Sequence, residues 1–527
     1  MLSDTYRNST ELDSSYRLNS FQPLHWIAII GVGAGGASYF RQALKKVIAD
    51  GVASSVGFLL LDVKSIEEQG KGIAWALNQA PFISANMHLP KIGYDPSDPN
   101  RLLELLGLQD NNFSQDASFL SRSEVGKAFS KDLNIHVEIA ERAGIPVNRI
   151  QGEAARVDRL GRGYAITLSS GEKLFADTVI LGLGHIPSTN YKELEGSPMY
   201  IGNPWDARSL DAIPSDANVA ILGLGPTAVD TINILRANGV KRIHALSRSG
   251  CMQYPRPNYG RYELKVLTRE YITEMANEHG GLTFMDILRG IGAEYRQAGI
   301  DCSGLKRAIA NARQRPEKAI PLGLADCQDS SEWFSVFKAL DDVTPLIWHL
   351  LPEQERTRYK REYRQAHVNV SYGSASKPAK KILEALHDGS LRVSGGLEEG
   401  SVHFAHGKYQ VSWLADGMRR QTGFDCVINC SGIGTDLTKA RYPLLGYLLG
   451  KGWLVPHPEG GALVDFESGQ LLTRERKPVG EIYSLVGSIT YGTHLLTHCM
   501  DQVVNSARRT SEAVHVKILE IAAPDKL

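Results

Sequence analysis

Residues 26–51, WIAIIGVGAGGASYFRQALKKVIADG, decide the fold of this chain. The apolar run 26–30 predicts a buried β-strand and residues 37–49 predict a helix. Between them Gly31, Gly33 and Gly36 form the pattern G-x-G-x-x-G. The first glycine makes a tight turn, the second lets a pyrophosphate approach the backbone, and the third lets helix and strand pack closely. Since free N–H groups at a helix start bind phosphate, we expect a dinucleotide-binding unit here.

A second apolar run follows this helix and ends in an acid. Residues 56–61 predict a strand, and Asp62 comes directly after it. A carboxylate at this place accepts hydrogen bonds from both hydroxyls of an adenosine ribose. It also repels a 2′-phosphate, so the first unit is expected to bind FAD or NAD rather than NADP.

The same pattern returns in residues 218–250, NVAILGLGPTAVDTINILRANGVKRIHALSRSG. A strand at 218–222 precedes Gly223, Gly225 and Ala228, which form G-x-G-x-x-A, and a helix is expected at 229–238. The next strand, 242–246, is followed by Ser247 and Arg248 instead of an acid. An arginine there can pair with a 2′-phosphate, which favours NADPH. A solvated surface arginine is the open alternative.

The repeat extends beyond the two glycine turns. Each is followed by a β-meander, at 149–175 and 391–424, and then by a buried strand with a glycine-rich end, at 178–185 and 427–432. One nucleotide fold inserted into another predicts this order. We therefore expect an α/β protein with two Rossmann-like dinucleotide-binding domains, one inserted in the other, β-meanders and a helical insertion. The expected division is a polar tail (1–24), a first domain (25–205 and 425–527, ending in a helix), a second domain (206–255 and 371–424) and a helical insertion or lid (256–370).

Composition sets nucleic acid and membranes aside. Lys plus Arg and Asp plus Glu both total 58 in 527 residues, so the basic surface that nucleic acid requires is not expected. Residues 1–24 lack the pattern of a secretory signal, and the apolar stretch 442–456 is too short to span a bilayer. Six scattered cysteines without a C-x-x-C pair fit a reducing compartment. We expect a cytoplasmic protein with a small-molecule substrate; a homo-oligomer is compatible with the sequence.

At this point the chain resembles the two-dinucleotide-binding flavoproteins and, within them, the FAD/NAD(P)-binding family of YdhS-like oxidoreductases. The resemblance extends from Ile27 to about Arg509. It implies bound FAD and NADPH. The chain departs from the family at 367–378, HVNVSYGSASKP, and at Gly487-Ser488, where many flavoproteins have an aspartate that holds the ribityl chain. The matching motifs are IAIIGVGAGG, GKGIAWALNQAPFISANMH, NPWDARSL, VAILGLGPTAVD, ALSRSGCMQYPRP, INCSGIGTDL and YSLVGSITYGTHLLTH.

Two segments, 70–88 and 487–498, are expected to meet the flavin ring. A helix beginning at Tyr491 and running to Met500 would point its N-terminus at the ring and stabilise negative charge there. Candidate catalytic residues are His88 and His494, with structural hydrogen bonding as the alternative for both. His494 and His498 stand four apart, but no metal is expected, because no H-E-x-x-H motif accompanies them. The cofactor-binding candidates of these segments are Gly70, Gly72, Asn86, Gly487 and Thr493.

Three functions remain open on the sequence. The leading interpretation is an FAD-dependent, NADPH-using monooxygenase of a small metabolite, with N-hydroxylation as one option. A disulfide reductase is disfavoured because it needs a redox dithiol, and Cys426 and Cys430 are separated by three residues along a predicted buried strand. The alternatives are an FAD-dependent dehydrogenase or oxidase of an amino or hydroxy acid, and a dinucleotide-binding sensor or scaffold without turnover.

Overall fold

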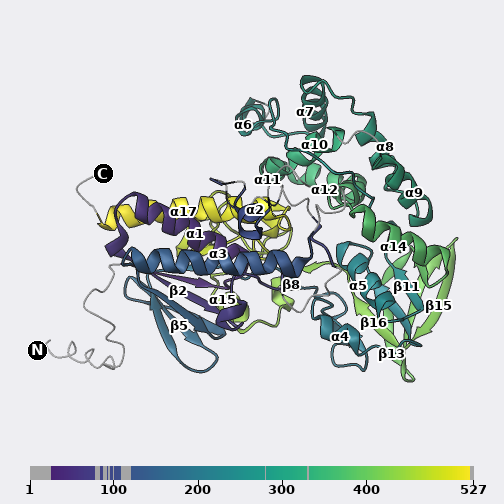
Figure 1. Cartoon of the computed structure of the whole chain (residues 1–527), viewed down its shortest axis with the longest axis horizontal. Coiled ribbons are helices and arrows are strands. Elements are labelled where there is room, and N and C mark those ends of the chain that lie inside the picture. The colour runs from purple at the N-terminus through teal and green to yellow at the C-terminus, as the bar shows by residue number, and fades with distance from the viewer. Residues whose placement is uncertain are drawn as a thin grey trace, which may run out of the picture.

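Two parallel sheets and a helical insertion build the molecule (Figure 1). The computed structural model describes residues 25–76, 83–86, 92, 95, 97–98, 100–108, 120–278, 280–328 and 332–522. Among these residues, no helix combines the length and the apolar character that crossing a membrane would require.

The first sheet carries the first glycine turn. Its order is β18-β19-β7-β1-β2-β3, all parallel except for the antiparallel edge pair β18–β19. The central strands are nearly all apolar because both faces of a parallel sheet are covered. The strands are β1 (His25–Ile30), β2 (Val56–Asp62), β3 (Val147–Gln151), β7 (Thr178–Leu181), β18 (Gln470–Leu472) and β19 (Pro478–Ser484).

Alternate side chains of β1 enter two different cores. Ile27 and Ile29 pack against one helical layer, whereas Ala28 and Ile30 pack toward the meander. Figure 1 shows α1, α3 and α17 along one side of the sheet and β5 on the other. The covering elements are α1 (Ala34–Ala49), α2 (Arg101–Leu106), α3 (Arg122–Arg142), α15 (Pro443–Gly450), α16 (Tyr491–His494), α17 (Met500–Ala522), β4 (Ala154–Leu160), β5 (Gly163–Leu168) and β6 (Lys173–Ala176).

The second sheet repeats this plan with the order β12-β11-β10-β16-β9 and only parallel pairs. A short antiparallel pair, β8 (Ile186–Pro187) with β17 (Ile433–Gly434), joins the two units. The remaining elements of this unit are β9 (Tyr200–Ile201), α4 (Ala207–Asp211), β10 (Asn218–Leu222), α5 (Pro226–Ala237), β11 (Arg242–Leu246), α14 (Ser376–His387), β12 (Leu391–Ser394), β13 (Leu397–Ala405), β14 (Lys408–Ala415), β15 (Met418–Phe424) and β16 (Cys426–Asn429).

Two strands lie across the domain boundaries expected from the sequence. β16 was assigned to the first domain, yet it pairs with β10, Val219 opposite Cys426. β9 was also assigned there, yet it pairs with β16. Both strands thus pair within the second sheet, and the sequence did not indicate this because a short apolar strand shows its partner only through long-range pairing.

The helical insertion lies in the crossover from β11 to β12 and contacts both units. Its aromatic core includes Trp333, Phe334 and Trp348, and Phe466 of the first unit packs into the same core. The indole Nε1 of Trp348 donates to the Gly492 carbonyl at 2.8 Å. Its helices are α6 (Arg269–Glu278), α7 (Phe284–Gln297), α8 (Ser303–Asn311), α9 (Pro316–Asp326), α10 (Glu332–Ala339), α11 (Thr344–Leu350), α12 (Glu353–Glu362) and α13 (Arg364–Ser371).

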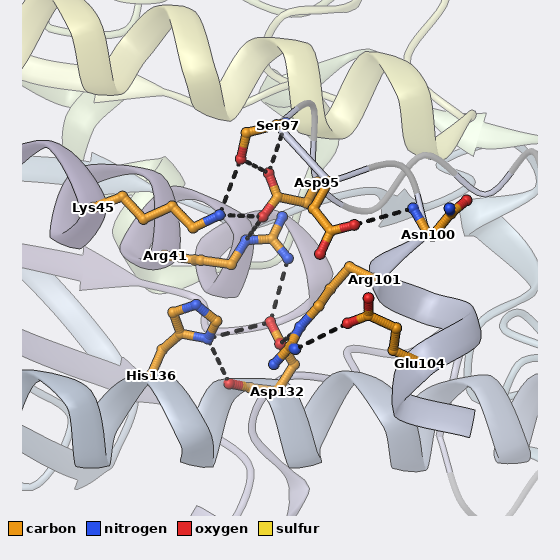
Figure 2. A network of polar contacts seen from close by, with 10 residues as sticks. Arg41, Lys45, Asp95, Ser97, Asn100, Arg101, Glu104, Asp132 and His136 are labelled. Carbon is orange, nitrogen blue, oxygen red and sulfur yellow. Dashed lines mark hydrogen bonds and ion pairs between the residues drawn. The ribbon is translucent and has the colours of Figure 1, made fainter. Parts of the chain in front are cut away.

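A buried charge network ties α1, α2 and α3 together (Figure 2). Asp132 lies 3.2 Å from Arg41 Nη1 and 2.8 Å from Arg101 Nε, and Asp95 contacts both Arg41 and Lys45. Burial opposes ionisation of Asp95, but Arg41, Lys45 and Ser97 outweigh it and lower the pKa of Asp95 to about 2. The buried Arg41 faces two carboxylates, as a stable buried ion pair requires.

Candidate functional site

The first glycine turn is closely packed. Gly31 donates to the Leu61 carbonyl at 2.8 Å and has φ +93°. A Cβ at Gly31 would lie 2.4 Å from the Gly182 carbonyl oxygen, and one at Gly36 would lie 2.2 Å from the Gly31 oxygen. Only glycine fits at both positions. No side chain of the described residues caps α1, so the N–H groups of its first turn are left for a ligand.

A second loop lies over this turn. The Gly70 amide donates to the Val32 carbonyl at 2.6 Å, and the Gly72 Cα lies 3.2 Å from the place of a Cβ at Gly33. Both loop glycines have positive φ, +95° and +67°, a region that side chains disfavour. Gly33 is therefore enclosed between its own helix and this loop.

Asp62 ends β2 beside the first turn. Its Oδ2 accepts the Val32 amide at 2.6 Å and its Oδ1 accepts the Lys64 amide at 2.9 Å. Burial raises the pKa of Asp62, against the effect of these hydrogen bonds. The carboxylate is thus fixed in orientation at the cavity wall.

The second glycine turn repeats the first with fewer constraints. Gly223 donates to the Leu246 carbonyl at 2.8 Å, and a Cβ on it would meet the Cys430 oxygen at 2.2 Å. A Cβ at Gly225 would meet no atom within 4 Å. Ala228, fully buried, packs in the place of the third glycine. Arg248 is exposed directly after β11. Because β10 and β11 are parallel, it lies at the same edge of the sheet as the second glycine turn.

One continuous cavity of about 1440 Å³ joins the two turns. It reaches from Asp62, past both helix starts, to Arg248 and under the insertion. The sequence-derived candidates among the residues that line it are Gly31, Gly33, Asp62, Gly72, Asn86, Gly223, Gly225 and Arg248.

Five other cofactor-binding candidates are not among the lining residues. Gly70 packs over the first turn, where its amide donates to the Val32 carbonyl at 2.6 Å. Gly36 and Ala228 pack each helix on its strand. Gly487 lies against the Gly184 carbonyl, where a Cβ would be 2.3 Å away. Thr493 is buried off the cavity, so its expected contact with a cofactor, like that of Gly487, stays a prediction that this packing does not support. Both belong to the packing behind the cavity wall.

The histidines that line the cavity are not the two candidates named from the sequence. His88 lies outside the described residues. His494 is buried away from the cavity: its Nε2 donates to the Phe466 carbonyl at 3.0 Å, and burial lowers its pKa to about 4. The catalytic role of His494 stays a prediction, which this burial and its contact with the Phe466 carbonyl do not support. His185 and His498 line the cavity instead, with stacked rings 4.6 Å apart.

The expected helix from Tyr491 to Met500 is interrupted. α16 ends at His494, Leu495 has φ +57°, and α17 begins at Met500. The break turns His498 into the cavity, so His494 and His498 do not share a helical face. Burial lowers the pKa values of His185, to about 4, and of His498, so both rings are neutral hydrogen-bonding groups.

A group of polar residues under the insertion was not predicted from the sequence. Tyr372 connects it to the first unit: its carbonyl accepts from Asn86 Nδ2 at 3.4 Å, and its ring lies 5.6 Å from that of His498. The spacing of polar residues at 364, 367 and 371, one face of α13, was the available signal. The missed lining residues are Arg256, Lys338, Arg364, His367, Ser371 and Tyr372.

Comparison with known proteins agrees with this arrangement. The family model described as FAD-NAD(P)-binding matches residues 28–186, which contain the first glycine turn, Asp62 and the first meander. No curated protein sequence matches the chain.

Solved structures resemble the chain over nearly its whole length. Ornithine hydroxylase (PvdA) from Pseudomonas aeruginosa has 13% identity and a TM-score of 0.56, covering 94% of this chain and 99% of that one. L-lysine 6-monooxygenase from Pseudomonas syringae has 14% identity, a TM-score of 0.57 and the same coverage. DfoA, the cadaverine monooxygenase from Erwinia amylovora, has 12% identity and a TM-score of 0.54, covering 94% of this chain and 95% of that one. The fold is therefore that of the Rossmann-type flavoenzymes, with two dinucleotide-binding units, as the sequence predicts.

Proposed function

We propose that this protein is an FAD-dependent monooxygenase that takes electrons from NADPH and oxidises a small metabolite. The main support is that two glycine turns, each at the start of a helix without a side-chain cap, open onto one cavity. This cavity continues under the helical insertion. Two nucleotides and a substrate in one enclosed space is what such a reaction needs.

The residues present fit two dinucleotides. At the first turn Gly31, Gly33 and Gly72 leave room for a pyrophosphate, and Asp62 is placed for the hydroxyls of an adenosine ribose. This set suits FAD. At the second turn Gly225 is open, and the exposed Arg248 offers a charge for a 2′-phosphate, which suits NADPH.

The bound nucleotides would supply hydride transfer and oxygen activation, and the protein supplies orientation and exclusion of water. The stacked rings of His185 and His498 form a rigid wall, held by a 3.1 Å contact between His185 Nε2 and the Thr497 hydroxyl. Asn86 and Tyr372 hold the loop at 86 against the insertion. These groups close the space around the reacting atoms.

The thiols of the cavity disfavour a disulfide reductase. Cys251, Cys430 and Cys499 line it from three separate elements and are free. Burial raises the pKa of each of these thiols, that of Cys430 to about 12. A protonated thiol is a poor nucleophile, so thiol–disulfide exchange is not favoured here.

We propose N-hydroxylation as the narrower reaction and YdhS-like proteins as the subfamily. The similar structures named as ornithine, lysine and cadaverine oxygenases support the reaction class. The subfamily rests on the sequence motifs quoted above. We also propose that the protein has no nucleic-acid partner, because its charges balance at 58 of each sign. We propose a cytoplasmic location because six scattered cysteines without a C-x-x-C pair fit a reducing compartment.

The test is the visible spectrum of the purified full-length chain, followed by anaerobic addition of NADPH. Flavin absorption that bleaches with NADPH and returns with oxygen is the expected result. A colourless protein would overturn the proposal and favour a sensor or scaffold. Flavin that ignores NADPH but is reduced by an amino or hydroxy acid would favour a dehydrogenase or oxidase.

A matched pair of variants assigns the flavin site. Gly33→Val puts a branched side chain where Gly72 already lies 3.2 Å from a Cβ, so flavin content should be lost. Gly446→Val makes the same change on an exposed face of α15 with open space around it, so flavin content should be kept. Equal flavin content in both variants would place FAD elsewhere.

A further inference from the structure

The cavity ends in a chamber built by the helical insertion. Three of its helices, α10, α12 and α13, contribute to the wall, and the segment containing α16 closes it from the first unit. We call this space the inner chamber and define it by the lining residues Lys338, Tyr359, Arg364, His367, Tyr372 and Tyr491.

The charged side chains that line the inner chamber are cationic, and no carboxylate is among the residues that define it. Lys338 is paired with the buried Asp341 behind the wall. Arg364 donates from Nη2 to the Tyr491 hydroxyl at 3.2 Å. In the described part of the chain no carboxylate lies within ion-pair distance of this guanidinium.

The acids that line the cavity lie elsewhere. All of those among the described residues belong to the two dinucleotide-binding units, and none comes from the insertion. They are Asp62, Glu153, Glu193, Asp206, Glu398 and Glu399. The positive chamber is therefore separated along the chain from the acids that could compensate it.

The other groups of the chamber are neutral. The Tyr359 hydroxyl and His367 Nδ1 are 2.7 Å apart. Burial lowers the pKa of His367 and raises the pKa values of Tyr359 and Tyr372, which keeps all three uncharged at neutral pH. They can hydrogen-bond to a ligand without adding negative charge.

A guanidinium withdrawn from bulk water costs free energy unless an anion compensates it. Its planar donors match a carboxylate with two parallel hydrogen bonds. We propose that the inner chamber binds the carboxylate of the substrate through Arg364, so that the enzyme oxidises a carboxylate-bearing small molecule. The oxidation rests on the proposed function, whereas carboxylate binding does not.

The geometry also orients such a substrate. Arg364 lies at the insertion end, and Tyr372 connects the chamber to Asn86 and His498 at the nucleotide end. A carboxylate on Arg364 leaves the rest of the molecule directed toward the turns. Arg364 is thus a specificity-determining residue that acts at a distance from the reacting atoms.

The experiment is calorimetric titration of the full-length protein with benzoate, acetate and succinate, and with benzamide and acetamide as uncharged counterparts. We expect one or more acids to bind and the amides to bind much more weakly. Arg364→Gln should weaken acid binding about 10- to 100-fold, the usual loss for a charged hydrogen-bonding partner. Arg364→Lys should retain part of it, because the charge stays and the planar fork is lost.

Arg361→Gln is the matched control, since this arginine stands on α12 with its side chain 71% exposed. Its acid affinity should equal that of the wild type. A nucleotide phosphate is the other anion that could seek Arg364, so NADP⁺ is titrated in parallel and should bind Arg364→Gln normally.

The proposal is overturned if no acid binds the wild type in the millimolar range, if amides bind as well as acids, or if Arg364→Gln loses NADP⁺ instead. The visible spectrum separates the two proposals. A colourless chain that still binds benzoate through Arg364 would refute the flavoenzyme and keep the carboxylate site. A flavin reduced by NADPH in a chain indifferent to acids would do the reverse.

Discussion

The two glycine turns have the same motif and different surroundings. At the first, Gly33 lies under the loop of Gly70 and Gly72. At the second, Gly225 has no atom near the place of a Cβ. Both turns line the cavity, but the first is covered by a second loop of the chain and the second has no such cover at Gly225. This difference favours a resident nucleotide at the first turn and an exchanging one at the second, in line with FAD and NADPH.

The largest expected effect tests packing at the two turns. Gly31→Ala combines a φ of +93° with a contact of 2.4 Å to a buried carbonyl. It should lower the free energy of unfolding by about 3 kcal/mol or more. Gly225→Ala should change it by less than about 0.5 kcal/mol, because its surroundings are open. Urea unfolding of both variants checks this, and equal losses would show that the position of Gly31 is no more constrained than that of Gly225.

A smaller effect tests the nucleotide at the open turn. Arg248→Gln removes the charge expected to meet a 2′-phosphate, so the KM for NADPH should rise about 10- to 100-fold while that for NADH stays nearly constant. Lys241→Gln, exposed at the other end of β11, is the control. Initial rates of flavin reduction measure both. If the KM values for NADPH and NADH rise equally, Arg248 does not bind the 2′-phosphate.

The smallest effect tests the acid at the enclosed turn. Burial raises the pKa of Asp62, so its protonation begins above the usual range as pH falls. The protonated carboxyl accepts fewer hydrogen bonds, and flavin affinity should fall about 2- to 10-fold from about pH 7 to about pH 4. Fluorescence of released flavin measures this.

Linkage gives the opposite sign for the chain without flavin. An acid whose pKa is raised in the folded state gains protons more readily than in the unfolded state, so its protonation stabilises the fold. The Asp62 contribution to folding therefore improves as pH falls, while flavin affinity drops. Asp62→Asn should remove most of the pH dependence of flavin release, and an unchanged profile would point to another group.

Much of the fold could be predicted from local patterns. The strands 218–222 and 242–246 have the predicted bounds, because an apolar run between turns is a local signal. α1 and α5 begin at Ala34 and Pro226, three residues earlier than predicted, since the glycines and proline of a turn conceal a helix start. The break at Leu495 could not be predicted, because leucine and threonine continue a helix unless tertiary contacts prevent it.

The candidate site divides in the same way. The turn residues, Asp62 and Arg248 were predictable because each stands next to a strand end with a known role. Lys338 and Arg364 were not, since only docking of the insertion brings them to the cavity. Arg41 and Asp132 look like solvated charges on amphipathic helices, yet they are buried together (Figure 2). Burial of charge depends on contacts far apart in sequence, which local patterns do not contain.

The indole of Trp348 on the Gly492 carbonyl has a mechanical consequence. The insertion belongs to the second unit by chain order, yet it is hydrogen-bonded to the first by this contact. A second hydrogen bond runs from the side-chain amide of Gln502 to the Asp341 carbonyl. An ion pair between Arg122 and Asp230, 3.0 Å long, is a third contact and connects α3 with α5. A swivel of one unit against the other must break all three. We therefore expect the two units to keep one arrangement while small ligands enter and leave the cavity between them.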